Sequence, residues 1–182
     1  MFKNYPRVVT WYTPRYAPFR EGFQKSCDKY GICCHIEADI EELPWKQGLY
    51  ERIVFLQDII RIYRDENLLW LDIDAIFLKE PDFLDDLQNQ LTLHAYQNPP
   101  KNQLYTGAII GFKANDISMK LFDTWRDYYK RNMNSDDSEK SLTSAVEHVG
   151  IVPATFPIEY YGHRSFTNPD LIIRFQNSVP LH

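Results

Sequence analysis

The chain has 182 residues, which is the size of one ordinary domain and is enough to bury a core without disulfides. Its 25 acidic and 20 basic residues give a formal net charge of -5, which argues against a large binding face for nucleic acid. Aromatic residues make up 15% of the chain, which excludes a disordered protein. We therefore expect a single domain spanning residues 1–182.

The cysteines and the apolar runs indicate the compartment. Cys27, Cys33 and Cys34 form an odd set with two adjacent members, which is a poor framework for disulfides and suits a reducing environment. No apolar run approaches the roughly 20 residues of a membrane span, and the first six residues carry no apolar signal core. The sequence thus predicts a cytoplasmic protein without a membrane span.

The first forty residues show a strand–helix–strand pattern. β-branched and aromatic residues over 7–13 predict a strand, which Pro14 ends. Apolar residues then recur every four positions over 19–27 and predict a helix, and Gly31 suits its C-terminal end. Residues 33–40 alternate weakly and predict a second strand. This order is typical of a parallel sheet with crossover helices.

The pattern continues along the chain. Residues 49–63 have apolar positions at spacings of three and four, which predicts an amphipathic helix. The continuous apolar run 68–71 suits a strand buried on both faces, and a second apolar run follows at 75–78. Together these segments predict an α/β domain with a mostly parallel, mixed central sheet flanked by helices. Further strands are predicted over 91–96, 105–112 and 171–175. Two further helices are predicted, one that begins after a cap at Asn115 or Asp116 and one over 142–149. Polar loops are predicted over 98–102 and 132–140.

Asp72 and Asp74 follow the buried run directly and are the sharpest chemical feature. Residues i and i+2 of an extended chain point to the same side, roughly 7 Å apart. Two carboxylates so placed repel each other unless a cation or donors lie between them. A hard divalent ion would satisfy both and leave positions free for phosphate oxygens. The alternative is a solvated turn, but the apolar runs on both sides and the carboxyl end of a parallel strand favour a ligand site.

The chain resembles nucleotide-sugar glycosyltransferases with the GT-A fold, and the matching motifs occur in the same order over almost its whole length. The resemblance is strongest to the small nucleotide-diphospho-sugar transferases of bacteria and phages. Residues 70–75 (WLDIDA) are similar to the family's Trp-[Ile/Leu]-Asp-Ala-Asp-Ala segment. The resemblance implies a single Rossmann-like GT-A domain. The other segments that resemble the family are 8–13, Ser26, Trp45 with 52–56, 106–108, Trp125, 138–142, 157–160 and 173–178.

The resemblance implies a hexosyltransferase that moves a sugar from a nucleotide-diphosphate sugar, which we expect to be a UDP-sugar, to a hydroxyl acceptor. Mn²⁺ or Mg²⁺ on Asp72 and Asp74 would bridge the diphosphate. Glu139 or Asp137 would take the acceptor's proton or orient the acceptor. Alternate strand residues face opposite sides, so at least one residue of 10–12 is expected in the core. The residues implied in donor binding are Thr10, Trp11, Tyr12, Arg52, Asp72, Gly107 and Arg174.

Three positions depart from the family pattern. Arg52 stands where Lys is usual, which keeps the charge but makes it a planar fork. Ser138 stands where Asp is usual, with acidic residues on both sides. Arg174 stands where many relatives have a metal-binding His, and an arginine cannot bind a metal. His163 is then a candidate third ligand, and the alternative is that Arg174 binds the diphosphate directly.

Two other functions remain open at this point. A nucleotidyltransferase would share the sheet and the metal, but residues 13–16 lack the Gly-rich phosphate loop it would need. A non-catalytic or weakly active nucleotide-sugar-binding protein is compatible with the departures at Ser138 and Arg174. The acceptor is also open between a glycan, a protein and a modified nucleic acid, and the net charge argues mildly against the last. The oligomeric state is not indicated by the sequence.

Overall fold

The N-terminal part forms the predicted parallel unit. The computed structural model describes residues 5–86, 91–98, 102–132, 138–163 and 169–176. β1 (Arg7–Tyr12) pairs in parallel with β2 (Cys34–Ala38). A 3-10 helix (Pro14–Phe19) and α1 (Arg20–Lys29) connect the two strands. The chain leaves α1 at Gly31, whose φ of 68° is left-handed and costs glycine little.

The central sheet is mixed, as predicted. α2 (Trp45–Ile62) leads into β3 (Asn67–Leu71), which pairs in parallel with β1 and antiparallel with β6 (Asn102–Lys113). The strand order is β2-β1-β3-β6-β5-β7, and three of the five pairings are parallel. The two strands at the far edge are β5 (Leu91–Asn98) and β7 (Ala154–Thr155). The fold class expected from the sequence is therefore confirmed.

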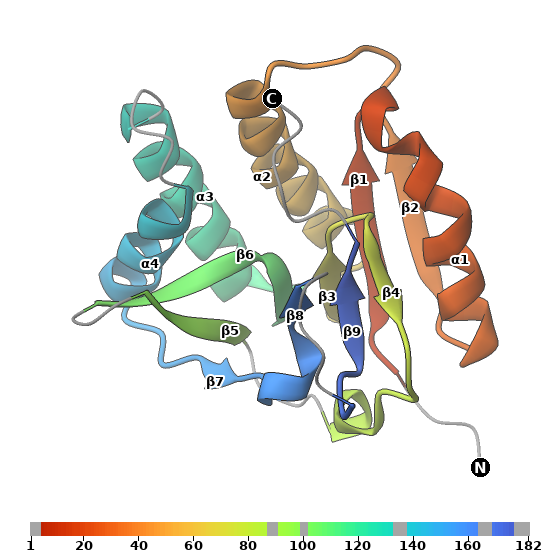
Figure 1. The fold of residues 1–182 in the computed structure, drawn as a ribbon. Helices are drawn as coiled ribbons and strands as arrows, with labels where there is room; N and C mark the ends of the chain where they lie inside the picture. The colour runs from red at the N-terminus through yellow and green to blue at the C-terminus, as the bar shows by residue number, and fades with distance from the viewer. Residues whose placement is uncertain (1–4, 87–90, 99–101, 133–137, 164–168, 177–182) are drawn as a thin grey trace.

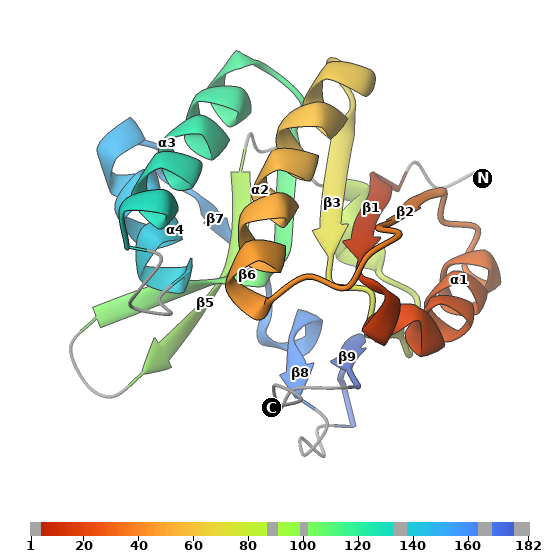
Figure 2. The same cartoon turned by 90° about the horizontal axis from the view of Figure 1, so that it is seen from above.

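Helices pack on both faces of this sheet (Figure 1). α2, α3 (Asp116–Asn132) and α4 (Ser138–Val149) share one hydrophobic core with one face of the sheet (Figure 2). α1 shares a second core with the other face. Trp70 of β3 lies in the first core and its neighbours Leu69 and Leu71 lie in the second, as the alternation of a strand requires. β3 is thus buried on both faces, as its apolar run predicted.

The apolar run after Asp74 joins a second, small sheet. β4 (Ala75–Phe77) pairs with β9 (Ile173–Phe175), and β9 pairs with β8 (Gly162–His163). In Figure 1 β9 lies between β4 and β8. This pairing is long-range, so the local pattern of 75–78 did not reveal it. It brings the C-terminal part of the chain to the turn that carries Asp72 and Asp74.

Several boundaries differ from the sequence prediction. Asn98 and Asn102, expected in a loop, pair with each other at the end of the β5–β6 hairpin, because antiparallel pairing outweighs their turn propensity. α4 begins at Ser138, inside the stretch expected to be a polar loop, and residues 133–137 lie outside the described part. Asn115 caps α3 as predicted, since its Oδ1 accepts the backbone N–H groups of Ile117 and Ser118 at 3.1 and 3.0 Å. Short 3-10 helices cover Asp82–Asp86 and Ile158–Tyr160.

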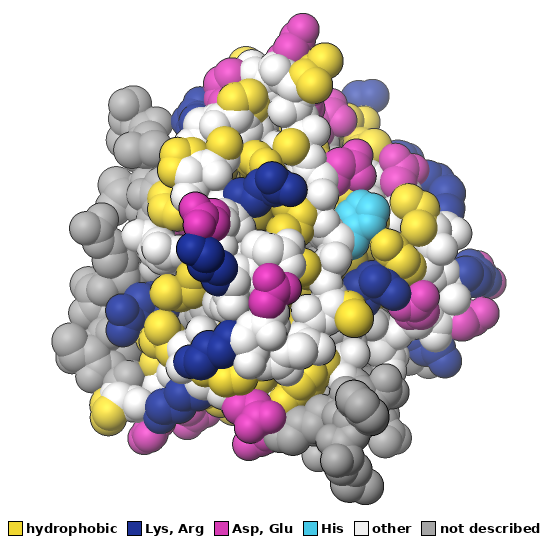
Figure 3. Space-filling model, turned by 90° about the vertical axis from the view of Figure 1, so that its right-hand side faces the viewer, with side chains coloured by type: hydrophobic (Ala, Val, Ile, Leu, Met, Phe, Trp, Pro, Cys, Tyr) yellow, Lys and Arg dark blue, Asp and Glu magenta, His cyan; other side chains and the backbone are white. Residues whose placement is uncertain are grey.

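Two surface properties bear on function. No helix of the described residues is long and apolar enough to cross a membrane. On the face that carries α1, acidic and basic side chains are interspersed (Figure 3). Mixed charge of this kind does not concentrate a positive potential on that face.

Candidate functional site

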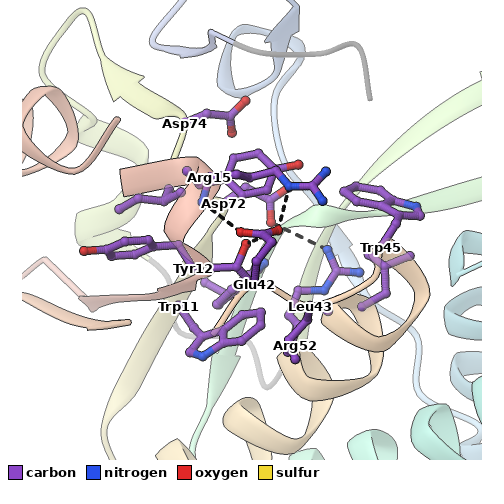
Figure 4. A pocket seen from close by; sticks show the side chains of 15 residues that line it. Trp11, Tyr12, Arg15, Glu42, Leu43, Trp45, Arg52, Asp72 and Asp74 are labelled. Carbon is purple, nitrogen blue, oxygen red and sulfur yellow. Dashed lines mark hydrogen bonds and ion pairs between the residues drawn. The ribbon is translucent and has the colours of Figure 1, made fainter. Parts of the chain in front are cut away.

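A cavity opens at the carboxyl ends of β1 and β3, beside the start of α2 (Figure 4). Its lining comes from three segments: the end of β1 and the residues after it (11–16), the residues before α2 and its first turns (42–52), and the end of β3 with the turn after it (70–74). The carboxyl edge of neighbouring parallel strands is where open α/β sheets bind ligands. The cavity is therefore the first candidate for a functional site.

Both predicted metal-binding carboxylates line this cavity. The backbone N–H of Asp72 donates to the carbonyl of Ala108 at 3.1 Å, which ties the turn to β6. The backbone N–H of Ala75 donates to the Asp72 carbonyl at 3.0 Å and closes the turn. The Asp72 side chain is 37% exposed, whereas Asp74 is 6% exposed. Asp72 is thus partly buried and Asp74 is largely buried.

Arg52 of α2 faces Asp72 across the cavity (Figure 4). Its Nη1 lies 3.5 Å from Oδ1 of Asp72, and its guanidinium lies over the ring of Trp125, 5.4 Å from the centroid. The Arg52 side chain is 9% exposed, and its Nε has no hydrogen-bond partner among the described residues. A guanidinium has five N–H donors, so the contacts found among the described residues leave donors of Arg52, its Nε among them, for an additional acceptor.

Gly107 makes room for this cation. A Cβ at position 107 would lie 2.8 Å from Nη2 of Arg52. The carbonyl of Gly107 also accepts a hydrogen bond from Nε1 of Trp70 at 2.9 Å. The sequence suggested that Gly107 would allow a close approach to the sugar, but the space that it leaves is occupied by Arg52.

The electrostatics of Asp72 connect the cavity with α4. Burial raises the pKa of Asp72 to about 6, although the Arg52 charge and hydrogen bonds from Arg52 and Trp70 act to lower it. The negative charge of Glu139, in the first turn of α4, raises it further. The Glu139 carboxylate is therefore close enough to Asp72 for their charges to interact.

The entrance to the cavity is shaped by an ion pair that the sequence did not reveal. Arg15 binds the Glu42 carboxylate twice, through Nε at 2.6 Å and its backbone N–H at 2.9 Å. Thr13 donates to the same carboxylate at 3.1 Å. Burial acts to raise the pKa of Glu42, but these hydrogen bonds outweigh it, so the pKa lies below its usual value. The loop before α2 is thereby fastened to the end of β1.

Of the three β1 residues predicted to bind the nucleotide, two line the cavity and one does not. Trp11 and Tyr12 line it. Thr10 is fully buried and does not line it, and its Oγ1 has no partner among the described residues. This agrees with the expectation that at least one residue of this strand faces the core. Thr10 is therefore not among the residues that face the cavity.

Of the remaining predicted residues, Glu139 and Arg174 are described and are not among those that line the cavity. Glu139 is near enough to influence Asp72, as described above, whereas Asp137 lies outside the described residues. Arg174 on β9 lies opposite Ile76 of β4, and its buried Nε has no partner among the described residues. The backbone of His163 pairs with β9, but its side chain is not described. Within the described part, no three His, Cys, Asp or Glu residues cluster as a metal site.

Asp72 and Asp74 nevertheless fit a Mg²⁺-type site. Such ions are usually held by one or two protein carboxylates, with substrate phosphates and water completing the coordination. The two carboxylates line one cavity at the edge of the sheet, and Asp72 lies beside Arg52. The residues present therefore fit an ion of this kind.

Comparisons with known proteins show which solved structures have a similar fold. No family model matches the sequence, and a comparison with curated proteins finds no match. Among solved structures, the fold is similar to that of a glycosyltransferase involved in the glycosylation of the major capsid of PBCV-1, with a TM-score of 0.69 at 10% identity. The match covers 96% of this chain and 94% of that chain. The chain thus shares the architecture of that enzyme over nearly its full length.

Proposed function

We propose that the protein is a metal-dependent glycosyltransferase of the GT-A type, which transfers a sugar from a UDP-sugar to a hydroxyl acceptor. The observation that carries this proposal is the convergence of Asp72, Asp74 and Arg52 on one cavity at the carboxyl edge of the sheet. Two carboxylates beside a buried cation suit a metal–diphosphate complex better than they suit a solvated turn. The similarity of the fold to a glycosyltransferase supports the same function.

The diphosphate would bind at the acidic end of the cavity. A divalent ion on Asp72 and Asp74 would stabilise the negative charge that develops on the leaving nucleoside diphosphate. Arg52 would donate charge-assisted hydrogen bonds to phosphate oxygens, for which its Nε is available. Arg174, with a second buried Nε and a place on the strand next to β4, is proposed as an additional phosphate ligand. His163 is kept as a candidate third metal ligand.

The nucleoside would occupy the other end of the cavity. Trp11 and Tyr12 come from the end of β1, and Trp45 comes from the start of α2. Trp45 is 46% exposed, so part of its ring is free to contact a ligand. These aromatic side chains give the base and ribose apolar surfaces, while the Arg15–Glu42 pair holds the loop that carries them.

The acceptor would approach from the side of α4. Glu139 is proposed to accept the proton of the acceptor hydroxyl or to orient that hydroxyl. Its influence on the pKa of Asp72 supports a position near the reacting atoms. Asp137 is kept as the alternative carboxylate.

A ligand screen tests the proposal. Thermal unfolding is measured with UDP- and GDP-sugars, with and without Mn²⁺, for the wild type and for Asp74→Asn. Binding at 100 times Kd should stabilise the wild type by about 2.7 kcal/mol, and Asp74→Asn should lose the metal-dependent part. Asp116→Asn, at a side chain that is 88% exposed, is the matched control and should behave as the wild type. A wild type that no nucleotide sugar stabilises would contradict the proposal.

The second candidate is a nucleotide-sugar-binding protein without transferase activity. It is favoured by the lack of a third metal ligand among the described residues. Release of UDP from the stabilising donor, either by transfer or by hydrolysis, would exclude it. Binding without any release of UDP would support it.

A further inference from the structure

Gly48 lies in the first turns of α2, at a position where the fold does not need a glycine. Its backbone N–H donates to the carbonyl of Pro44 at 2.9 Å, as in an ordinary helical turn. Its φ is not left-handed, unlike those of Gly31 and Gly150. A Cβ at position 48 would meet no atom within 4 Å apart from its neighbours in the helix backbone, whereas a Cβ at Gly107 would collide with a side chain.

The missing side chain of Gly48 has a cost in stability. Glycine is among the least favourable residues in a helix interior, because it loses the most backbone freedom on folding. Neither packing nor backbone conformation offsets this loss at position 48. What the glycine does provide is open space in the wall of the cavity, because Gly48 is one of the residues that line it.

Gly48 lies between two ligand-binding groups on one face of α2. The residues of α2 that line the cavity recur at spacings of one and three and therefore share a face: Trp45, Gly48, Leu49 and Arg52. Along the helix axis, Gly48 lies about 4.5 Å from Trp45 and about 6 Å from Arg52. Figure 4 shows Trp45 and Arg52 on the same side of the cavity. This face thus presents, in order, an aromatic ring, bare backbone and a cation.

The order of these groups matches the order of base, ribose and phosphates in a nucleoside diphosphate. On the basis of the proposed function, we propose that the nucleoside of the donor packs directly on the backbone of α2 at Gly48, with its base toward Trp45 and its phosphates toward Arg52. The missing side chain then sets how closely the donor can approach the helix. Gly48 therefore determines the binding of the nucleoside and not that of the metal or the phosphates.

The test compares a nucleoside diphosphate with the diphosphate alone. Calorimetry with Mn²⁺ gives the Kd of UDP, of GDP and of inorganic pyrophosphate for the wild type, Gly48→Ala and Gly48→Leu. A helical side chain lies over the preceding turn, so the added group would lie toward Trp45 and away from Arg52. Gly48→Leu should weaken the nucleotide that binds the wild type better by about 5- to 100-fold, as expected for steric overlap in a filled site, and Gly48→Ala should weaken it less. The Kd of pyrophosphate should stay unchanged.

Thermal unfolding separates this role from a structural one. Alanine and leucine are better helix formers than glycine and the space at position 48 is open, so the melting temperature of both variants should rise by about 1–4 °C. A damaged fold cannot explain variants that are more stable and yet bind the nucleotide more weakly. Gly22→Ala, at an exposed glycine of α1 outside the cavity lining, is the matched control and should leave all three constants unchanged.

The remaining outcomes overturn one proposal or the other. Equal weakening of the nucleotide and of pyrophosphate by Gly48→Leu would mean that α2 as a whole has shifted, and would overturn this inference. Unchanged nucleotide affinity in both Gly48 variants would show that the nucleoside lies elsewhere, and would also overturn it. A wild type that binds neither UDP nor GDP in the presence of Mn²⁺ would overturn the proposed function itself.

Discussion

At the scale of single residues, Arg52 shows how a cavity can be prepared for an anion. Its guanidinium has Asp72 on one side at 3.5 Å and the Trp125 ring on another, and Gly107 leaves the space it needs. Asp72 uses only part of the hydrogen-bonding capacity of the guanidinium, and the buried Nε has no partner among the described residues. Under the proposed function, the remaining donors would bind an oxygen of the diphosphate.

Substitution of Gly107 tests this geometry. In Gly107→Ala the new Cβ would meet Nη2 of Arg52 at 2.8 Å, so the guanidinium must move. Loss of a hydrogen bond to a charged group costs about 1.5–3 kcal/mol, so UDP in the presence of Mn²⁺ should bind roughly 10- to 100-fold more weakly. Calorimetry measures the change. Gly22→Ala, whose Cβ would meet only Gln176 at 3.8 Å, is the control, and equal affinities for the two variants would contradict the prediction.

The pKa of Asp72 predicts how metal affinity depends on pH. The folded-state pKa of about 6 is above the ordinary 3.8, so the carboxyl becomes protonated as the pH falls through 6. Because a metal binds the ionised form, Mn²⁺ affinity should be constant above this value and fall about tenfold per pH unit below it. The same shift means that the metal-free protein loses stability as the pH rises from about 4 to 6. Calorimetric titration of Mn²⁺ between pH 5 and 7.5 tests the first effect, and an affinity that does not change would contradict it.

At the scale of elements, α3 connects the two sides of the site. The Arg52 guanidinium lies over the ring of Trp125 of α3. Its Nε1 donates to the carbonyl of Ser138 at 3.1 Å, which holds the first residue of α4. Glu139 follows directly. One buried side chain thus positions the proposed phosphate ligand of α2 and the proposed carboxylate of α4.

Two substitutions of Trp125 separate these contacts. Trp125→Phe keeps an aromatic ring under Arg52 but loses the bond to Ser138, so UDP affinity should be retained while kcat falls. Trp125→Leu loses both contacts, so it should also weaken UDP binding and destabilise the fold by about 3 kcal/mol. Calorimetry, donor turnover and denaturant unfolding provide the three measurements. If Trp125→Phe weakened UDP binding as much as Trp125→Leu does, the assignment of separate roles would be wrong.

At the scale of the whole molecule, the C-terminal segment is hydrogen-bonded to the turn that carries Asp72 and Asp74. The backbone N–H of Gln176 donates to the Asp74 carbonyl at 2.9 Å, and that of Leu78 donates to the Ile172 carbonyl at 2.7 Å. These bonds attach β9 to the residues on both sides of β4. The turn with Asp72 and Asp74 is therefore held by the central sheet on one side and by the small sheet on the other.

Gly162 tests the contribution of the small sheet. A Cβ at this position would clash with Cγ, Cδ1 and Cδ2 of Leu171, so Gly162→Ala must displace Leu171. Overpacking of this kind costs about 1–3 kcal/mol and should loosen β8 against β9. Hydrogen exchange should then increase at the amides of Ile173 and Gln176, with little change at the amides of β3. Uniform exchange across both sheets would contradict a local effect.

The order of the elements could be predicted because it depends on local patterns. Periodicity identified α2, the buried run identified β3, and Asn115 marked the start of α3. The partners of β4 and β9 could not be predicted, because short strands have no local signal for their neighbours. The Arg15–Glu42 pair and the stack of Tyr161 on His94 were missed for the same reason, since each joins residues from distant segments.

The sequence by itself determined that two carboxylates follow a doubly buried strand, because burial and alternation are properties of consecutive residues. Only the tertiary structure decided which groups face them. Packing against Trp125 and Gly107 directs Arg52 toward Asp72, and pairing of β9 with β4 brings the C-terminal segment to Asp74. These contacts join residues that are far apart in the sequence, so they exist only once the chain has folded.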